Sequence, residues 1–324
     1  MRLSLPSKGR LADDAMNFLA DCGLRVYKPN PRQYEAAIPS LPGLKVLFQR
    51  PGDIVVSVRD GSVEFGITGR DVVEEKKGQN SELLLLHDAL DFGHCALTLA
   101  VPESWTDIEN MADLSQRAAG KPLRVATKYP ILTGGFLARH HIPYSLISAE
   151  GTLETAPAIG YADLISDLVS SGQTLRDNRL KTISDGVIQV SEAVLIANRH
   201  SLMNDPAALD TARRLLEFIE AHQRATENLA IFANIRGDDP QEIAGLLFTQ
   251  MTIGGLQGPT ISKVFVREST PGWHAVNIVV RRDRIFEAVA ELRAVGGSGV
   301  VVLPVTYIFE EEPPRYKAML EALQ

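Results

Sequence analysis

Two aspartates and a small turn stand close together in the segment from Ala162 to Leu175, which reads A-D-L-I-S-D-L-V-S-S-G-Q-T-L. An apolar run carries Asp163 and Asp167 and then breaks into the turn. A carboxylate in a buried strand is costly unless a partner binds it. Two carboxylates facing a ligand suit ribose hydroxyls or a pyrophosphate that carries Mg²⁺, because both offer donors or positive charge.

The turn that follows has the composition of a phosphate-binding loop. It presents three hydroxyls, and its glycine lets the backbone approach a ligand closely. Helix-compatible residues come next, and consecutive N–H groups at the start of a helix bind phosphate. A plainer interpretation is open, in which both aspartates lie on the surface of an ordinary strand and S-S-G is a loop, because one glycine-containing turn is a weak signal. The turn consists of Ser170, Ser171, Gly172, Gln173 and Thr174.

The segment and its flank resemble the signature of the ATP phosphoribosyltransferases, the family that opens histidine biosynthesis. The residues on the spacing of that signature are Glu154, Gly160, Ala162, Ile165, Asp167, Ser171, Gly172, Thr174 and Leu175. Five further segments resemble the family in the family's own order. They are L-P-S-K-G-R-L from Leu5, R-P-G-D-I from Arg50, G-I-T-G-R-D from Gly66, L-D-F-G-H-C from Leu90 and A-T-K-Y-P from Ala126.

The resemblance implies transfer of the phosphoribosyl group of phosphoribosyl pyrophosphate to N1 of the ATP adenine, with release of pyrophosphate. It also implies Mg²⁺ bound to that pyrophosphate by few protein ligands. Pyrophosphate leaves readily and N1 is already nucleophilic, so no residue is assigned as a general base and catalysis should rest on positioning and electrostatics. The chain contains no G-x-S-x-G, H-E-x-x-H, Walker A or G-x-G-x-x-G sequence, which agrees with this expectation.

By the same resemblance, Asp163 and Asp167 hold the ribose hydroxyls and the turn wraps the 5-phosphate. Lys8, Arg10 and Arg50 are candidates for binding pyrophosphate or the ATP phosphates, although composition alone favours solvated basic residues at these positions. The G-I-T-G turn adds N–H donors or, alternatively, provides tight packing of a strand on a helix. The remaining candidates for substrate binding are Thr68, Gly69, Asp91, Lys128 and Tyr129.

Composition excludes several classes of protein. The chain has 324 residues, enough for two or three domains with their own cores. With 33 Lys and Arg against 40 Asp and Glu, its net charge is −7, which argues against a nucleic-acid partner. An anionic ligand must therefore be captured by local basic residues.

Two cysteines, Cys22 and Cys95, are too few for a disulfide framework and form no metal-binding spacing, so we expect buried thiols in a reducing cytosol. The amino-terminal segment has no long apolar core of a signal peptide. No run reaches the roughly 18 apolar residues of a membrane span. We therefore expect a cytoplasmic protein with no membrane partner.

Strands alternating with helices predict α/β architecture with a mostly parallel sheet. Strands are expected at 2–6, 45–49, 65–68, 83–86, 95–101, 123–127, 144–147, 163–169 and 188–197, and helices at 10–22, 132–140 and 152–159. The resemblance implies a two-lobed core like the type II periplasmic binding proteins, with crossings near 88–94 and 176–186. Lobe I is then 1–90 plus 180–225, and lobe II, with the phosphoribosyl-pyrophosphate site, is 91–179.

A helix expected over 205–227 leads to a third module at 228–309. Its pattern is strand 229–236, helix 240–250, strands 260–267 and 273–280, helix 283–295 and strand 299–306, which is the ferredoxin-like (ACT-like) order. The module resembles the regulatory domain of long-form enzymes, which lets histidine inhibit them as homodimers and homohexamers. Loose alignment suggests Asp238, Thr260 and Ser298 for histidine, with caps and turns as the alternative. Residues 310–324 are predicted to be a solvated tail.

Two other functions are compatible with the pattern. One is a non-catalytic two-lobed sensor of a small anion, which would not need Asp163 or Asp167. The other is a phosphoribosyltransferase for a different base. Release of pyrophosphate from ATP and phosphoribosyl pyrophosphate would separate the three hypotheses.

Overall fold

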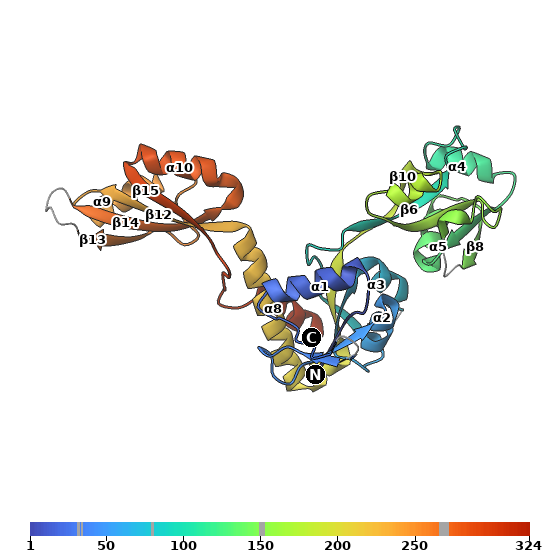
Figure 1. Ribbon diagram of the computed structural model, residues 1–324, viewed down its shortest axis with the longest axis horizontal. Coiled ribbons are helices and arrows are strands. Elements are labelled where there is room, and N and C mark those ends of the chain that lie inside the picture. The colour runs from blue at the N-terminus through green and yellow to red at the C-terminus, as the bar shows by residue number, and fades with distance from the viewer. Residues whose placement is uncertain (31–32, 34, 79–80, 149–152, 266–271) are drawn as a thin grey trace. The chain divides into compact units, whose positions relative to one another are not determined.

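Three β-sheets with flanking helices make up the chain, as the computed structural model in Figure 1 shows. The structure describes residues 1–324 except 31–32, 34, 79–80, 149–152 and 266–271. The chain divides into two compact units, Met1–Arg213 with Arg315–Gln324 and Arg214–Pro314. The first unit contains two of the sheets, one in each lobe, and the second contains the third.

Lobe I is built on a six-stranded sheet in the order β2-β3-β1-β4-β11-β5. Strands β3, β1 and β4 are parallel, and β11 lies antiparallel between β4 and β5. The strands are β1 (Arg2–Pro6), β2 (Glu35–Ala37), β3 (Lys45–Gln49), β4 (Phe65–Gly69), β5 (Leu83–His87) and β11 (Ala193–Asn198). The helices are α1 (Arg10–Asp21), α2 (Pro51–Arg59), α3 (Arg70–Lys76) and α7 (Arg199–Asn204).

Lobe II repeats this plan on a five-stranded sheet in the order β10-β6-β9-β7-β8. Strands β8, β7 and β9 are parallel, and β6 lies antiparallel between β9 and β10. The strands are β6 (Cys95–Pro102), β7 (Leu123–Thr127), β8 (Tyr144–Ser148), β9 (Leu164–Val169) and β10 (Leu180–Ser191). The helical segments are α4 (Met111–Ala118), α5 (Pro130–Arg139), η1 (Leu153–Thr155) and α6 (Gln173–Asp177).

The repeated plan is that of the type II periplasmic-binding-protein fold, and the predicted α/β, two-lobed class is confirmed. The outward crossing lies between β5 and β6, as predicted near 88–94. The return crossing comes after Ser191, later than the predicted 176–186, because β10 pairs with β6 along the edge of the lobe II sheet. The strand predicted over 188–197 is therefore two strands in two sheets. The predicted helix over 152–159 is only a short 3₁₀ turn at η1, and its predicted start at Thr152 is outside the described residues.

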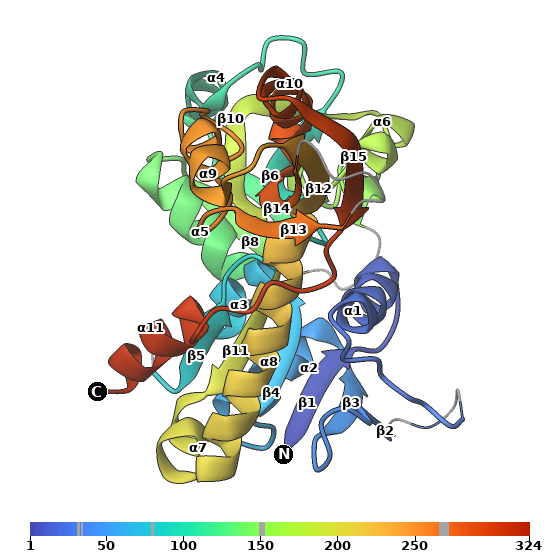
Figure 2. The same ribbon diagram turned by 90° about the vertical axis from the view of Figure 1, so that its left-hand side faces the viewer.

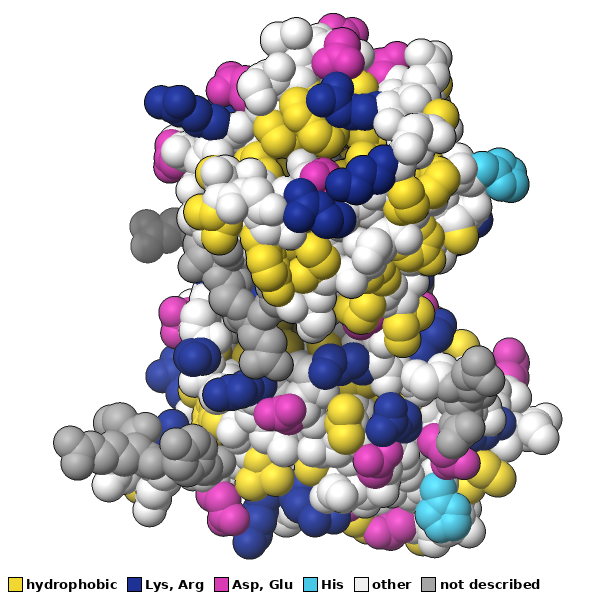
Figure 3. Space-filling view, turned by 90° about the vertical axis from the view of Figure 1, so that its right-hand side faces the viewer, with side chains coloured by type: hydrophobic (Ala, Val, Ile, Leu, Met, Phe, Trp, Pro, Cys, Tyr) yellow, Lys and Arg dark blue, Asp and Glu magenta, His cyan; other side chains and the backbone are white. Residues whose placement is uncertain are grey.

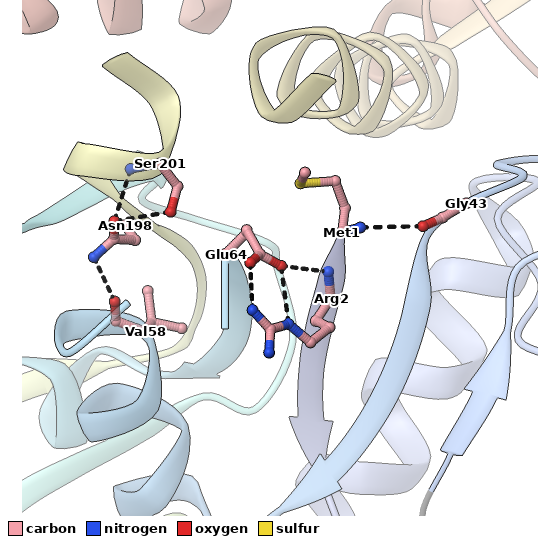
Figure 4. A network of polar contacts seen from close by, with 7 residues as sticks. All are labelled: Met1, Arg2, Gly43, Val58, Glu64, Asn198 and Ser201. Atoms are coloured by element: carbon pink, nitrogen blue, oxygen red, sulfur yellow. Dashed lines mark hydrogen bonds and ion pairs between the residues drawn. The ribbon is translucent and has the colours of Figure 1, made fainter. Parts of the chain in front are cut away.

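Close packing in lobe I explains part of the G-I-T-G sequence. All five residues of β4 are buried. A Cβ on Gly66 would lie 2.5 Å from Cγ2 of Ile54 on α2, so only glycine lets this helix lie so close to the strand. The Arg2 side chain donates to the Glu64 carboxylate, and Asn198 bonds both Val58 and Ser201, which fixes α2 and α7 on the sheet (Figure 4).

The second unit contains a four-stranded antiparallel sheet in the order β13-β14-β12-β15. This is the strand order that a βαββαβ chain gives in the ferredoxin-like fold. Alternate residues of β12 and β14 face a core formed with the two helices. The elements are β12 (Asn228–Arg236), α9 (Pro240–Phe248), β13 (Thr260–Val264), β14 (Trp273–Arg281), η2 (Arg282–Arg284), α10 (Ile285–Ala294) and β15 (Gly297–Pro304). The predicted end of β13 at Arg267 is outside the described residues.

Helix α8 (Pro206–Thr226) leads into this unit. The C-terminal segment differs from the predicted solvated tail, because α11 (Pro314–Leu323) returns to lobe I (Figure 2). Met319 is buried and Arg315 forms an ion pair with Asp88 at 2.7 Å. A helix with an apolar side gains more by packing than by staying in water. Among the described residues, no helix has both the length and the apolar character to cross a bilayer.

Candidate functional site

The turn after β9 forms a compact loop at the end of the strand. Gly172 has φ 70°, a left-handed conformation that favours glycine, and it directly precedes α6. The Arg176 side chain donates to the Ser171 carbonyl at 3.1 Å and to the Gln173 side chain at 3.0 Å. These two hydrogen bonds fix the loop to the helix that follows it. Ser170, Ser171 and Thr174 are exposed. The loop therefore presents exposed hydroxyls, and its own arginine maintains its shape.

The two aspartates of the segment lie in opposite electrostatic environments. Asp163 immediately precedes β9, and Asp167 is near the strand's other end, beside the loop. The Arg124 guanidinium holds the pKa of Asp163 below its usual 3.8. Burial raises the pKa of Asp167 above 3.8, with Lys128 partly opposing the rise. Asp163 is thus a satisfied carboxylate, whereas Asp167 is desolvated and has no ion-paired cation among the described residues, which is a feature of binding sites.

Asp163 is fully engaged by its neighbours. Its Oδ1 accepts from Arg124 Nη2 at 2.8 Å, and its Oδ2 accepts from the Arg124 backbone N–H, also at 2.8 Å. Arg124 in turn donates to the Gly160 carbonyl at 2.9 Å. The structure therefore does not bring Asp163 and Asp167 together on one ligand, because four residues of extended strand separate them by roughly 13 Å.

Replacing Asp163 with asparagine should lower the free energy of unfolding by about 1 kcal/mol, after discount for partial exposure. The folded-state pKa is lowered, so this stabilisation is present above pH 3.8 and is lost as the pH falls through the lower folded value. Urea unfolding at pH 7 and at pH 3 measures both effects. A variant equally destabilised at the two pH values would contradict the ion-pair assignment.

Lys128 and Asp167 lie at the same edge of the lobe II sheet. Strands β7 and β9 are parallel neighbours with Thr127 opposite Ser166, so the two following residues are side by side. Lys128 is exposed, and its charge lowers the pKa of Asp167. The combination of an exposed ammonium, a desolvated carboxylate and the loop suits a phosphorylated sugar with hydroxyl groups.

Three buried hydroxyls that the sequence analysis missed fix these strand ends. The Thr133 hydroxyl lies 3.3 Å from that of Thr127 and 2.8 Å from that of Ser166. Thr127 Oγ1 also accepts from the Tyr129 N–H at 2.9 Å. These contacts connect β7, β9 and α5 directly beneath Lys128 and Asp167. The available signal was a set of hydroxyl residues inside apolar segments, where an unpartnered hydroxyl is costly.

In lobe I, Lys8 and Arg50 are brought to one edge of the sheet. Both are exposed and follow the neighbouring parallel strands β1 and β3, and the Ser7 N–H donates to the Gln49 carbonyl at 2.8 Å. The Gln49 side chain bonds both Ser4 and Ser57, which fixes this strand end. Arg10, in contrast, lies on α1 with its guanidinium 3.5 Å from Asp14, in a solvated pair.

The other lobe I candidates have structural partners. The Thr68 hydroxyl is buried and donates to the Pro51 carbonyl at 3.4 Å. A Cβ on Gly69 would lie 2.3 Å from Oδ1 of Asp71, so glycine is required for that carboxylate to fold back. Asp91 has φ 63° at the outward crossing, and its exposed carboxylate lies 3.3 Å from His94 Nε2. Such left-handed backbone at a non-glycine residue is uncommon and is found at functional positions.

The candidates in the second unit are not brought together. The Asp238 carboxylate accepts from the Gly272 N–H at 3.1 Å, and the Ser298 hydroxyl donates to the Asn234 carbonyl at 3.4 Å. Thr260 lines a cavity of about 610 Å³ on the sheet face away from the helices, and neither Asp238 nor Ser298 lines this cavity. Its other polar lining residues are Gln257, Asn277 and Glu310, and Asn277 has a buried Oδ1 with no hydrogen-bond partner among the described residues.

The distribution of basic side chains and of metal-binding residues bears on two other kinds of site, for nucleic acid and for a metal ion. On the face in Figure 3, Lys and Arg side chains are dispersed among acidic and apolar ones. Groups of three or more His, Cys, Asp or Glu residues arranged for a metal ion are absent from the part of the chain that the structure describes.

Comparisons with known proteins find two family models that match this chain. The family model described as ATP phosphoribosyltransferase matches residues 50–221, and the model described as "HisG, C-terminal domain" matches 225–307. ATP phosphoribosyltransferase 2, chloroplastic, from Arabidopsis thaliana is 46% identical over 332 residues, covering all of this chain and 80% of the relative. ATP phosphoribosyltransferase from Bradyrhizobium sp. (strain ORS 278) is 34% identical, covering 99% and 97%.

A solved structure also resembles about two thirds of this chain. It is the ATP phosphoribosyl transferase (HisG:HisZ) complex from Thermotoga maritima, and a chain of that complex is 24% identical with a TM-score of 0.52. The match covers 68% of this chain and 98% of the other. The similarity at this identity concerns the fold, and about one third of the present chain has no counterpart in it.

Proposed function

The chain belongs to the ATP phosphoribosyltransferase family, and from that membership we propose how its residues transfer a phosphoribosyl group to N1 of the ATP adenine in the first step of histidine biosynthesis. The observation that carries the residue assignment is the contrast at β9. Asp167 is desolvated, has no ion-paired cation in the described part of the chain and lies beside an exposed hydroxyl loop, whereas Asp163 is already bound by Arg124.

In this proposal, the Asp167 carboxylate accepts hydrogen bonds from the ribose hydroxyls of phosphoribosyl pyrophosphate. The hydroxyls and N–H groups of residues 170–174 bind the 5-phosphate, and Lys128 balances the negative charge. Lys8 and Arg50 bind pyrophosphate or the ATP phosphates at the lobe I strand ends. Asp163 and Arg10 are assigned to the structure rather than to a substrate, because each already has a charged partner.

Catalysis follows from placement of two bound substrates. N1 of adenine attacks C1 of the ribose, the C1–oxygen bond to pyrophosphate breaks, and the electron pair leaves with pyrophosphate. Developing negative charge on the leaving group is stabilised by the ammonium and guanidinium groups of Lys8 and Arg50, which need no proton transfer. Held at bonding distance in the right orientation, the two reactants avoid much of the entropic cost of meeting.

We propose Mg²⁺ as the cofactor, bound chiefly by the pyrophosphate of the substrate. The donor set fits this arrangement, because Asp167 is a desolvated carboxylate whose Oδ1 accepts from the Leu168 N–H and whose Oδ2 is the atom left for a cation or a hydroxyl. Mg²⁺ commonly uses one or two carboxylates together with substrate phosphates and water. When bound, the ion neutralises the leaving pyrophosphate.

Pyrophosphate release tests the proposed reaction. Purified protein with ATP, phosphoribosyl pyrophosphate and Mg²⁺ should release pyrophosphate only when both substrates are present. Omission of either substrate, or addition of a chelator, should abolish the release. Release that proceeds without ATP would instead indicate hydrolysis of phosphoribosyl pyrophosphate.

We propose further that histidine inhibits the enzyme by binding in the 610 Å³ cavity of the second unit. The buried Asn277 Oδ1, which has no hydrogen-bond partner among the described residues, suits its ammonium group, and the Thr260 hydroxyl suits its carboxylate. This replaces Asp238 and Ser298 as candidates, because their side chains bond the backbone elsewhere. Homodimers, homohexamers and a cytoplasmic location are proposed on the resemblance alone. The plant relatives are named as chloroplastic.

Replacing Thr260 with valine should raise the histidine concentration for half-inhibition by about five- to tenfold, because one hydrogen bond to the effector is lost while the side-chain shape is kept. Uninhibited kcat should not change. Ser298→Ala serves as the control, since its hydroxyl bonds the Asn234 carbonyl outside the cavity lining. Histidine inhibition curves for the unsubstituted enzyme, Thr260→Val and Ser298→Ala measure this change. Equal shifts of the half-inhibition concentration in both variants would contradict this location of the histidine site.

A further inference from the structure

Helix α3 of lobe I contributes two buried carboxylates, Asp71 and Glu75, one helical turn apart. Asp71 is 2% exposed and Glu75 is 6% exposed. Neither is among the residues paired with Lys, Arg or His in the described ion pairs. Buried carboxylates are costly unless hydrogen bonds satisfy them. Their partners therefore show what holds them there.

Glu75 caps the first turn of a helix in the other lobe. Its Oε1 accepts from the Ile131 N–H at 2.8 Å and its Oε2 accepts from the Leu132 N–H at 2.9 Å. These N–H groups belong to the first turn of α5, where no intrahelical acceptor exists and where negative charge is favourable. The N-cap residue of this helix, Tyr129, makes no side-chain cap bond of its own, and lobe I supplies the acceptors.

Asp71 binds the residue that directly precedes the same helix. Its Oδ2 accepts from the Tyr129 hydroxyl at 2.7 Å, and its Oδ1 accepts from the Ser191 hydroxyl at 2.6 Å. Ser191 also accepts from the Asp71 N–H at 2.9 Å, at the point where the chain returns to lobe I. Burial and the Asp71 charge raise the pKa of Tyr129 above its usual range, so its hydroxyl stays protonated as a donor.

Both contacts converge on one short segment. Lys128 directly precedes Tyr129, whose N–H is held by Thr127 and whose hydroxyl is held by Asp71. On the other side, α3 starts directly after Gly69 at the end of β4. The segments that end β4 in lobe I and β7 in lobe II are therefore connected through one helix and three hydrogen bonds to its two carboxylates.

We propose that Asp71 and Glu75 are positioning residues that hold the Lys128 turn of lobe II at a fixed place relative to the strand ends of lobe I. We name the pair with its bonds to Tyr129, Ile131 and Leu132 the α3–α5 clasp. This inference rests on the proposed function, in which one substrate binds at each set of strand ends. The clasp contacts no substrate and acts on the alignment of two substrates already bound, so its loss lowers kcat without weakening the binding of either substrate alone.

Glu75→Gln tests this claim, with Glu74→Gln as the matched control. Glu74 is the neighbouring residue, and its carboxylate makes only an exposed ion pair with Lys77 at 2.6 Å. In Glu75→Gln, kcat should fall about tenfold while the separate dissociation constants for ATP and phosphoribosyl pyrophosphate stay within twofold. Hydrogen exchange at the Ile131 and Leu132 amides should accelerate at least tenfold. Glu74→Gln should change none of these.

A double-mutant cycle on Asp71→Asn and Tyr129→Phe provides the second test. The double variant should have the same kcat as the more affected single variant, because both changes act on the same Tyr129–Asp71 hydrogen bond. This cycle also applies if Glu75→Gln does not fold. Unchanged kcat in folded Glu75→Gln, or independent effects in the cycle, would overturn the inference. Absence of activity in the unsubstituted enzyme would instead overturn the proposed function.

Discussion

Replacing Asp167 with asparagine should lower kcat/KM for phosphoribosyl pyrophosphate by roughly 5- to 150-fold, which corresponds to about 1–3 kcal/mol for a lost charge-assisted hydrogen bond. The amide keeps the size of the side chain but weakens its acceptor to the ribose hydroxyls. Steady-state kinetics with ATP saturating measure the change. A value unchanged within twofold would remove Asp167 from the site.

The raised pKa of Asp167 gives this substitution two further signatures. The carboxylate must be ionised to accept, so kcat/KM should rise with pH through a value above 3.8 in the unsubstituted enzyme, and this limb should be absent in Asp167→Asn. Because the folded-state pKa is raised, stability from the neutral carboxyl is present below pH 3.8 and is lost as the pH rises through the folded value. Asp167→Asn should therefore be as stable as the parent at pH 7 or more so, whereas Asp163→Asn should be less stable.

Replacing Gly172 with valine should raise KM for phosphoribosyl pyrophosphate at least tenfold. At φ 70° an L-residue costs roughly 1–2 kcal/mol, and a β-branched residue more. A Cβ there would also lie 3.1 Å from Nη1 of Arg176, the side chain that closes the loop through the Ser171 carbonyl. The loop N–H groups would no longer share one orientation toward the 5-phosphate. Isothermal titration with phosphoribosyl pyrophosphate measures the loss directly.

Gly172→Asn is the matched control for backbone conformation. Asparagine tolerates the left-handed region better than other non-glycine residues, so this variant should keep a larger part of the affinity than Gly172→Val. Equal losses in the two variants would mean that steric contact with Arg176 matters and that backbone conformation does not. Affinity unchanged in both variants would exclude the loop as the phosphate site.

The strand ends illustrate what the sequence could predict and what it could not. The apolar run before the S-S-G turn predicts β9 and the loop, because strand, carboxylate and glycine signals are all local. The role of Asp163 was not predictable in this way. Its partner Arg124 lies 39 positions earlier, and only the pairing of β7 with β9 brings the two together. Arg10 differs, since its partner Asp14 is local and the exposure of the pair could not be read from a motif.

The same limit applies to contacts between lobes. Asp71 and Glu75 stand four residues apart in a helix, a spacing that indicates one helix face but no partner. Their acceptor roles toward Tyr129 and the start of α5 depend on how the chain crosses between lobes and returns. The predicted return near 176–186 was too early, because β10 carries polar residues and a bulge yet still pairs with β6 up to Ser191. Edge pairing of that kind leaves a weak periodic signal in the sequence.

The central claim is that this chain joins the ribose of phosphoribosyl pyrophosphate to ATP. Mass spectrometry of the nucleotide product tests it most directly, with ATP, adenine, guanine and uracil offered separately in the presence of Mg²⁺. We expect a single new product, which is ATP carrying one phosphoribosyl group at N1. It should form only with ATP and in equal amount to the released pyrophosphate. No adduct at any protein concentration, or an adduct formed only with another base, would contradict it.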